Sequence, residues 1–114
     1  MYIFDWDIKS DCVYFSPRWK SLIGYKDNEI DNNFKEWEVR VHPDDLEPTQ
    51  EIIQNYFSGQ TDIYDATFRM KHKNGSWVWI QARGKVSRDQ NNEPLRMVGF
   101  HTDVTKHKQL LDKY

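Results

Sequence analysis

The 114-residue chain has little cysteine, no long apolar run and little net charge, and each shortage excludes a class of protein. Its single cysteine cannot form a disulfide within the chain, so nothing points to an oxidising compartment. No apolar stretch approaches the roughly 18 residues that a membrane-spanning helix needs, and residues 1–5 do not resemble a signal peptide. The net charge of -2 gives no electrostatic reason to expect nucleic acid. We therefore expect a cytoplasmic segment that contacts neither membrane nor nucleic acid.

A charged fraction of 30% and a mean hydropathy of -0.91 are also typical of disordered chains. The aromatic content of 15%, with five tryptophans, argues against disorder, since disordered chains are poor in such residues. A chain of this length can form one domain that buries roughly two thirds of its unfolded surface. Because it opens in a predicted strand and closes in a predicted helix, we expect a piece of a longer protein.

The second half of the chain predicts three strands of an antiparallel sheet, at residues 64–71, 76–82 and 95–102. The first of them alternates apolar or small side chains with polar ones, which is the period of a half-buried strand. Asn74-Gly75 is the strongest short-range signal for a hairpin, because a type I′ turn needs positive φ at both central positions. Polar residues over 89–94 indicate a second, looser turn, and the last strand leads into a helical tail.

The first half predicts two short strands, two short helices and one longer helix. We expect the strands at residues 2–7 and 12–15 and the longer helix at about 46–57. Ser16 before a proline is a typical helix start, because its hydroxyl can cap the helix and proline is tolerated at the first helical position. Asn33 with Glu36 fits a similar cap for a second helix. Separate runs of strands and helices indicate an α+β fold, with helices on one side of an antiparallel sheet.

Six segments of the chain match one known family in the correct order. They are Trp6-Asp7, residues 16–25, 41–45 and 68–75, Trp79-Ile80, and residues 98–105. Together they resemble the PAS family, in the subgroup with a C-terminal PAC motif. The resemblance implies a five-stranded antiparallel sheet in the order 2-1-5-4-3, with short helices on one face around a small cavity and a C-terminal helical tail. It also implies a PAS/PAC sensor domain over residues 1–103 and the start of a signalling helix over 104–114.

The resemblance further implies a function without catalysis. PAS domains act as sensors or relays in histidine kinases of two-component systems, diguanylate cyclases and phosphodiesterases, and they commonly dimerise. We therefore expect a linked effector domain, a homodimer formed through the sheet face or the terminal helices, and, for a sensor, a small-molecule ligand. The competing interpretation is a structural dimerisation module with a filled core and no ligand.

Nine apolar residues are expected to face the space between the helices and the sheet. They are Trp19, Ile23, Trp37, Ile53, Phe57, Phe68, Met70, Ile80 and Phe100. A ligand cavity with a few polar groups on its wall and a plain core at crystal-like density both fit such a set. Five tryptophans fill volume efficiently, so we favour the plain core or a small, closed cavity.

The four histidines are the remaining candidates for metal binding or acid–base catalysis. His42, which precedes Pro-Asp-Asp, has neighbours suited to metal binding or acid–base catalysis, but Asp45 is well placed as a helix cap, so we favour a structural role. His72, His101 and His107 lie far apart and lack metal-ligand spacing. The sequence offers no nucleophile–base pair and no phosphate-cradling glycine loop, so we predict no enzyme activity and no metal site.

The resemblance makes haem and photoreactive flavin the two cofactors to consider. Some PAS domains hold haem through a histidine on the long helix, but residues 46–57 contain none. The photoreactive flavin branch needs a cysteine in an Asn-Cys-Arg-Phe-type motif near that helix, whereas Cys12 lies in the second predicted strand, where we expect a small buried hydrophobe. Haem and photoreactive flavin are therefore not expected, and the identity of any cofactor stays open.

Two further features point to the outer face of the sheet and the chain end. Trp77 and Trp79 alternate with apolar residues, so both faces of their strand are apolar and the outer face needs cover from the tail helix, an upstream helix or a second chain. The competing interpretation leaves Trp77 partly exposed near the turn. By resemblance, Asp103, Val104 and Thr105 form the signal output, where the last strand meets the tail helix.

Overall fold

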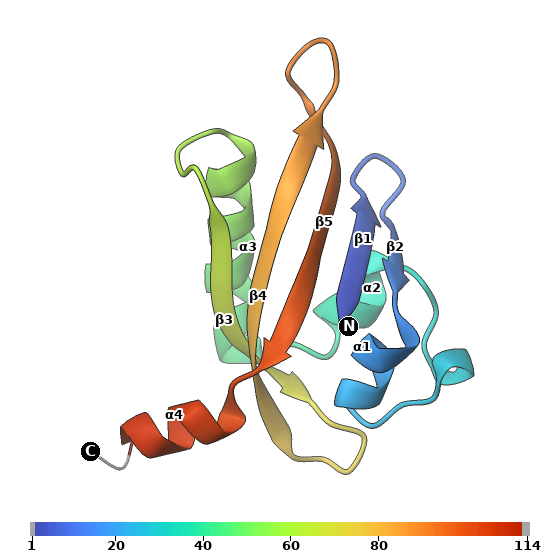
Figure 1. The fold of residues 1–114 in the computed structure, drawn as a ribbon, viewed down its shortest axis with the longest axis vertical. Helices are drawn as coiled ribbons and strands as arrows, with labels where there is room; N and C mark the ends of the chain where they lie inside the picture. The colour runs from blue at the N-terminus through green and yellow to red at the C-terminus, as the bar shows by residue number, and fades with distance from the viewer. Residues whose placement is uncertain (1, 113–114) are drawn as a thin grey trace.

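The computed structural model describes residues 2–112, and side chains for residues 2–108 (Figure 1). In chain order the elements are β1 (Ile3–Asp7), β2 (Cys12–Phe15), α1 (Pro17–Leu22), the 3-10 helix η1 (Asp27–Glu29), α2 (Phe34–Glu38), α3 (Pro43–Phe57), β3 (Tyr64–Lys71), β4 (Trp77–Arg88), β5 (Pro94–Asp103) and α4 (Thr105–Asp112). The last two residues of the expected signalling helix, 113–114, lie outside the described residues. No helix in the described part is both long and apolar enough to span a bilayer.

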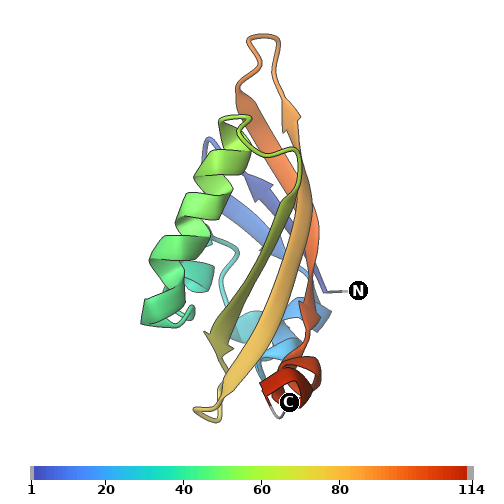
Figure 2. The ribbon, with the colours of Figure 1, turned by 90° about the vertical axis from the view of Figure 1, so that its left-hand side faces the viewer.

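The five strands form one antiparallel sheet in the order β2-β1-β5-β4-β3, which confirms the expected α+β architecture and strand order. The long β4–β5 hairpin extends past the other strands in Figure 1. In Figure 2, α3 lies along one side of the strands and α4 lies on the other. The described tail is therefore placed on the face of the sheet opposite to the core.

The core lies between the inner face of the sheet and helices α1 to α3. Alternation along β3 and β4 turns Phe68, Val78 and Ile80 inward, where all three are buried. Rings from both layers meet there: Trp37 on α2 packs edge-on against Phe68, with ring centroids 5.5 Å apart. The helices thus cover one face of the sheet, as the sequence predicts.

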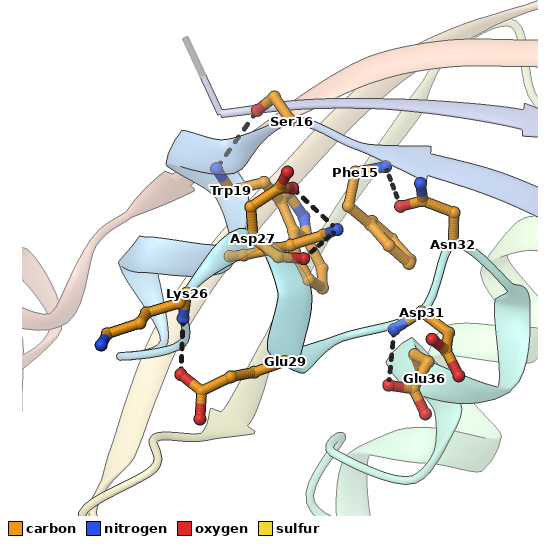
Figure 3. Close-up of polar contacts among 10 residues, drawn as sticks. Phe15, Ser16, Trp19, Lys26, Asp27, Glu29, Asp31, Asn32 and Glu36 are labelled. Atoms are coloured by element: carbon orange, nitrogen blue, oxygen red, sulfur yellow. Dashed lines mark hydrogen bonds and ion pairs between the residues drawn. The ribbon is translucent and has the colours of Figure 1, made fainter.

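Two of the expected helix caps are present. The hydroxyl of Ser16 accepts a hydrogen bond of 3.2 Å from the backbone N–H of Trp19 (Figure 3). The side chain of Asn33 accepts one of 3.1 Å from the N–H of Glu36. These local signals are confirmed because each depends only on residues within one turn of the helix that it starts.

The start of α3 differs from the prediction. The helix begins at Pro43, three residues earlier than expected, and its cap is His42, whose Nδ1 accepts from the N–H of Asp44 at 3.0 Å. The expectation that Asp45 caps the helix is therefore wrong. Its carboxylate instead turns to β3, where it binds Arg69. The structural role expected for His42 fits its position as the cap.

Two further local expectations need correction. The Asn74-Gly75 hairpin forms, but only Gly75 of the pair has positive φ, so the turn is not of type I′ and a longer loop joins β3 to β4. Cys12 is exposed rather than buried. Alternation in β2 turns Val13 inward, and this places its neighbour Cys12 on the outer face.

Candidate functional site

A small cavity of about 30 Å³ lies within the core, between the sheet and the helices. Its wall is formed by Phe4, Trp6, Val13, Phe15, Phe34, Trp37, Ile53, Tyr64, Met97 and His101. Two of the nine residues expected to line such a space, Trp37 and Ile53, are among them. The volume has room for about two water molecules, so the expectation of a small cavity agrees with the geometry.

The other seven residues of that set are placed elsewhere. Trp19, Ile23, Phe68, Met70 and Ile80 are buried in the core but lie outside the cavity wall. Phe57 is half-buried and packs against Trp6, with centroids 5.4 Å apart. Phe100 is 43% exposed on the outer face, so its assignment to the inner side is wrong. Alternation along β5 turns Met97 and His101 inward and Phe100 outward.

His101 is the main wall residue that the sequence did not predict. Its Nδ1 accepts a hydrogen bond of 2.8 Å from Trp19 Nε1, and its ring lies 5.1 Å from that of Phe4 and 5.5 Å from that of Phe68. Burial lowers the pKa of His101 to about 3, because the charged imidazolium would lose its hydration. The ring is therefore neutral near pH 7 with its proton on Nε2. The sequence of β5 has apolar or aromatic residues at both parities, so its period of two alone does not identify His101 as an inward residue.

Tyr64 is the second polar residue in the wall. Burial raises the pKa of its hydroxyl above the ordinary value, so it stays protonated. Among the described residues no hydrogen bond joins the Tyr64 hydroxyl or His101 Nε2 to another protein group, and neither atom is among the fully buried atoms that lack a partner. The cavity therefore presents two protonated polar groups on an aromatic wall. No group of three or more potential metal ligands occurs among the described residues.

An open groove of about 370 Å³ borders the cavity on its outer side. Its lining residues are Trp6, Asp11, Phe34, Gln50, Ile53 and Gln54. Trp6, Phe34 and Ile53 line both spaces, and the rings of Trp6 and Phe34 are stacked with centroids 4.8 Å apart. A single layer of side chains thus separates the cavity from the groove.

The expected signal-output residues meet at the end of β5. Asp103 Oδ1 accepts from the N–H of Thr105 at 2.9 Å, at the start of α4. Thr105 Oγ1 accepts from the N–H of Trp79 at 3.0 Å, and the N–H of Val104 donates to the Trp79 carbonyl at 2.9 Å. Both backbone polar groups of Trp79 are therefore bound by the segment that leaves the sheet. The output role of the three residues stays a prediction.

The Trp79 ring is also in contact with two cations on the outer face of the sheet. The guanidinium carbon of Arg69 lies 5.1 Å from the ring centroid and Lys108 Nζ, on α4, lies 4.8 Å from it. Such contacts contribute about 0.5–1 kcal/mol each at exposed sites. The tail helix thus supplies part of the cover that this face was expected to need. Trp77, near the turn, is partly exposed and its ring contacts that of His42.

Arg69 extends this contact to α3. Asp45 Oδ1 and Oδ2 each accept from the guanidinium at 2.8 Å, and Oδ2 also accepts from the Arg69 backbone N–H at 2.8 Å. These bonds hold the pKa of Asp45 below its usual range and the pKa of Arg69 above its own. A continuous path of polar and ring contacts therefore joins the start of α3 to α4.

Replacing Asp45 by asparagine is expected to lower the free energy of unfolding by about 1.5 kcal/mol at pH 7, because the charged bidentate pair is lost. The folded pKa of Asp45 lies below that of the unfolded chain, so its contribution is present at neutral pH and is lost as the pH falls below about 4. Urea denaturation of the wild type and of Asp45→Asn should show that their free energies of unfolding differ less at pH 3 than at pH 7. Asp44→Asn, at a largely exposed carboxylate, is the matched control and should change stability by less than about 0.5 kcal/mol. Equal losses in the two variants would exclude the Arg69 pair as the cause.

The fold and the site together define an α+β module with a small aromatic cavity on one side of the sheet and the C-terminal helix α4 on the other. The sequence model of the PAS fold family matches residues 12–101, and the chain belongs to this family.

Similar proteins are parts of signalling enzymes. The crystal structure of a sensory box histidine kinase/response regulator from Burkholderia thailandensis is 32% identical with a TM-score of 0.86, covering 97% of this chain and 82% of that one. The N-terminal domain of a diguanylate cyclase with a PAS/PAC sensor, from Marinobacter aquaeolei, is 23% identical with a TM-score of 0.80, covering 93% and 96%. Hybrid signal transduction histidine kinase A of Dictyostelium discoideum is 32% identical over 73 residues, which are 61% of this chain. This chain spans 3% of the length of that kinase.

PAS domains of histidine kinases and diguanylate cyclases are sensory modules, and this chain shares their fold and family. Light-oxygen-voltage domains also share the fold, at identities of 14 to 18%, and that likeness shows the fold alone. The expectations about haem and flavin therefore stay predictions.

Proposed function

We propose that the chain is a non-catalytic sensory or relay domain of a larger cytoplasmic signalling protein of the histidine kinase, diguanylate cyclase or phosphodiesterase type. In this proposal residues 1–103 form the sensor, and residues 104–114 begin the helix that leads to an effector domain. A ligand or partner that prefers one packing of the sensor would shift the populations of two states, and the effector would respond to that shift.

One observation carries the proposal: a wall residue of the cavity and the residue that starts the output helix are two positions apart on β5. His101 faces the cavity, and the Asp103 carboxylate accepts from the first N–H of α4. Two residues of strand span about 7 Å, so a shift of β5 that accommodates an occupant is carried directly to Asp103. The Trp79 contacts give the same shift a second route to α4.

A structural dimerisation module is the second candidate, and exposed apolar side chains on the outer face support it. Val98 and Phe100 are each 43% exposed on β5, and Tyr14 on β2 is exposed as well. Asp5 of β1 pairs with both Val98 and Tyr14, so these side chains lie in one row across three strands. A homodimer through this face is compatible with either function.

Replacing Thr105 by valine is expected to change the output of the effector domain about fivefold. Valine keeps the shape of the side chain but removes the acceptor of the Trp79 N–H, and a loss of about 1 kcal/mol corresponds to roughly a fivefold change in a two-state equilibrium. The measurement is kinase or cyclase activity of the full-length protein, with circular dichroism to establish folding.

Thr102→Val is the matched control, because Thr102 is an exposed threonine near the end of β5, and the Trp79 N–H is bound by Thr105 instead. Its output should equal that of the wild type. If the Thr105 variant also matches the wild type while the protein still dimerises, the relay is refuted and the structural module is favoured.

A further inference from the structure

The inner cavity holds a hydrogen-bond donor of fixed direction. The indole N–H of Trp19 occupies Nδ1 of His101 at 2.8 Å, so the neutral imidazole carries its proton on Nε2. His101 is only 5% exposed, and no acceptor for Nε2 occurs among the described residues. A water molecule in the cavity, or an occupant that supplies an acceptor, can satisfy this donor. Tyr64, 4% exposed, places a hydroxyl in the same wall.

The wall also restricts the charge and shape of an occupant. None of its ten residues is an aspartate, glutamate, lysine or arginine. An ion placed there would lose its hydration without gaining a counter-charge, so the part of an occupant that lies in the cavity must be neutral. The groove adds one carboxylate, that of the exposed Asp11. Most of the wall is aromatic, and rings such as those of Trp6 and Phe34 pack best against another flat ring.

Room for a ring comes from the neighbouring groove. The cavity of about 30 Å³ is too small for one, but the groove of about 370 Å³ lies behind Trp6, Phe34 and Ile53. Phe34 is the half-buried member of this partition, and it stands on α2, a helix of five residues. A rotation of Phe34 away from Trp6 would join the two spaces into one site that reaches His101.

We propose that the joined site binds an uncharged aromatic molecule that carries a carbonyl oxygen or a ring nitrogen, and that this atom accepts the Nε2–H of His101. The molecule reaches the cavity from the groove, past Phe34. This inference rests on the proposed sensory function and names the class of ligand that the sensor would take.

Three probes of similar size test the inference on the full 114-residue chain at pH 7.5 by titration calorimetry. Acetophenone has a ring and a carbonyl acceptor, ethylbenzene lacks the acceptor, and benzoate carries a charge. We expect acetophenone to bind at least tenfold more tightly than ethylbenzene and benzoate not to bind. Equal affinities for the first two probes would overturn the role of His101. Binding of benzoate, or no binding of any probe, would overturn the ligand class and leave water as the occupant.

The His101→Phe variant should bind acetophenone and ethylbenzene with equal affinity, whereas His107→Phe, at an exposed position on α4, should keep the tenfold preference. Because the variant at position 101 also removes the acceptor of Trp19, ¹⁵N NMR of the wild-type imidazole provides a test that does not depend on its folding. The Nε2 resonance should show a protonated nitrogen and should shift with acetophenone but not with ethylbenzene; an Nε2 without a proton would overturn the inference. The Thr105→Val measurement uses none of these probes, so a failed ligand class and a failed relay are distinguishable.

Discussion

Lowering the pH from 7 to 5 is expected to reduce the free energy of unfolding by about 2 kcal/mol, through the single imidazole of His101. Burial lowers the pKa of His101 to about 3 in the folded chain, whereas an unfolded histidine has a pKa near 6.5. Between these values the unfolded chain binds one more proton than the folded chain. Stability therefore falls with decreasing pH from 6.5 downwards, by about 1.4 kcal/mol per pH unit.

The carboxylates do not obscure this range of pH. The pKa values of Asp5, Asp45 and Asp89 are lowered from 3.8, chiefly by hydrogen bonds to Arg96, to Arg69 and to the backbone N–H of Glu93 respectively. Groups with a lowered pKa contribute stability that is lost only below about pH 4. These three carboxylates therefore do not account for a loss of stability between pH 6.5 and pH 5.

His101→Gln separates this effect from other causes, because glutamine offers Trp19 an acceptor but does not titrate. Urea denaturation at pH 7, 6 and 5 should give a variant whose stability changes by less than about 0.5 kcal/mol over the range. His107→Gln removes an exposed histidine and should keep the wild-type slope. If the free energy of unfolding of His101→Gln fell with pH as steeply as that of the wild type, the imidazole of His101 would not be buried in its neutral form.

The sequence of β5 alone does not determine which of its residues face the core. Val98, Phe100 and His101 place apolar or aromatic side chains at both parities, so the pattern cannot choose which set faces inward. Pairing with the neighbouring strands decides it: Phe100 lies opposite Ile3 and Arg83, on the outer face, and His101 turns to Trp19. A shift of one residue would exchange the two sets, and this is why Phe100 was predicted in place of His101.

The role of Asp45 could not be predicted for a related reason. A carboxylate in the first turn of a helix is a familiar local signal, and the sequence offers nothing that points to a partner 24 residues away. The caps at Ser16 and Asn33 were predictable because donor and acceptor lie three residues apart. The strand order was predictable only from the family resemblance, since the pairing of β1 with β5 joins opposite ends of the chain.

Gly99→Ala is expected to lower the free energy of unfolding by about 3 kcal/mol or more, a larger loss than the one expected for Asp45→Asn. A Cβ at Gly99 would lie 2.1 Å from the carbonyl oxygen of Arg83 on β4 and 2.7 Å from Cζ of Phe4 on β1. The φ of Gly99 is outside the left-handed region, so the position needs glycine for lack of space and not for backbone freedom. The clash with Arg83 involves backbone, so it can be relieved only by separating β4 from β5.

Gly84→Ala is the matched control, because Gly84 pairs directly with Gly99 under the same phenylalanine ring. Its Cβ would lie 3.1 Å from the Val98 carbonyl oxygen and 3.3 Å from Phe4 Cζ, contacts that small shifts can accommodate, so the expected loss is about 1 kcal/mol. Urea denaturation of both variants measures the difference. Similar losses would show that the close approach of β4 to β5 at Gly99 does not limit stability. A much larger loss at Gly99 would show that β4 and β5 approach too closely at this point to accept a side chain between them.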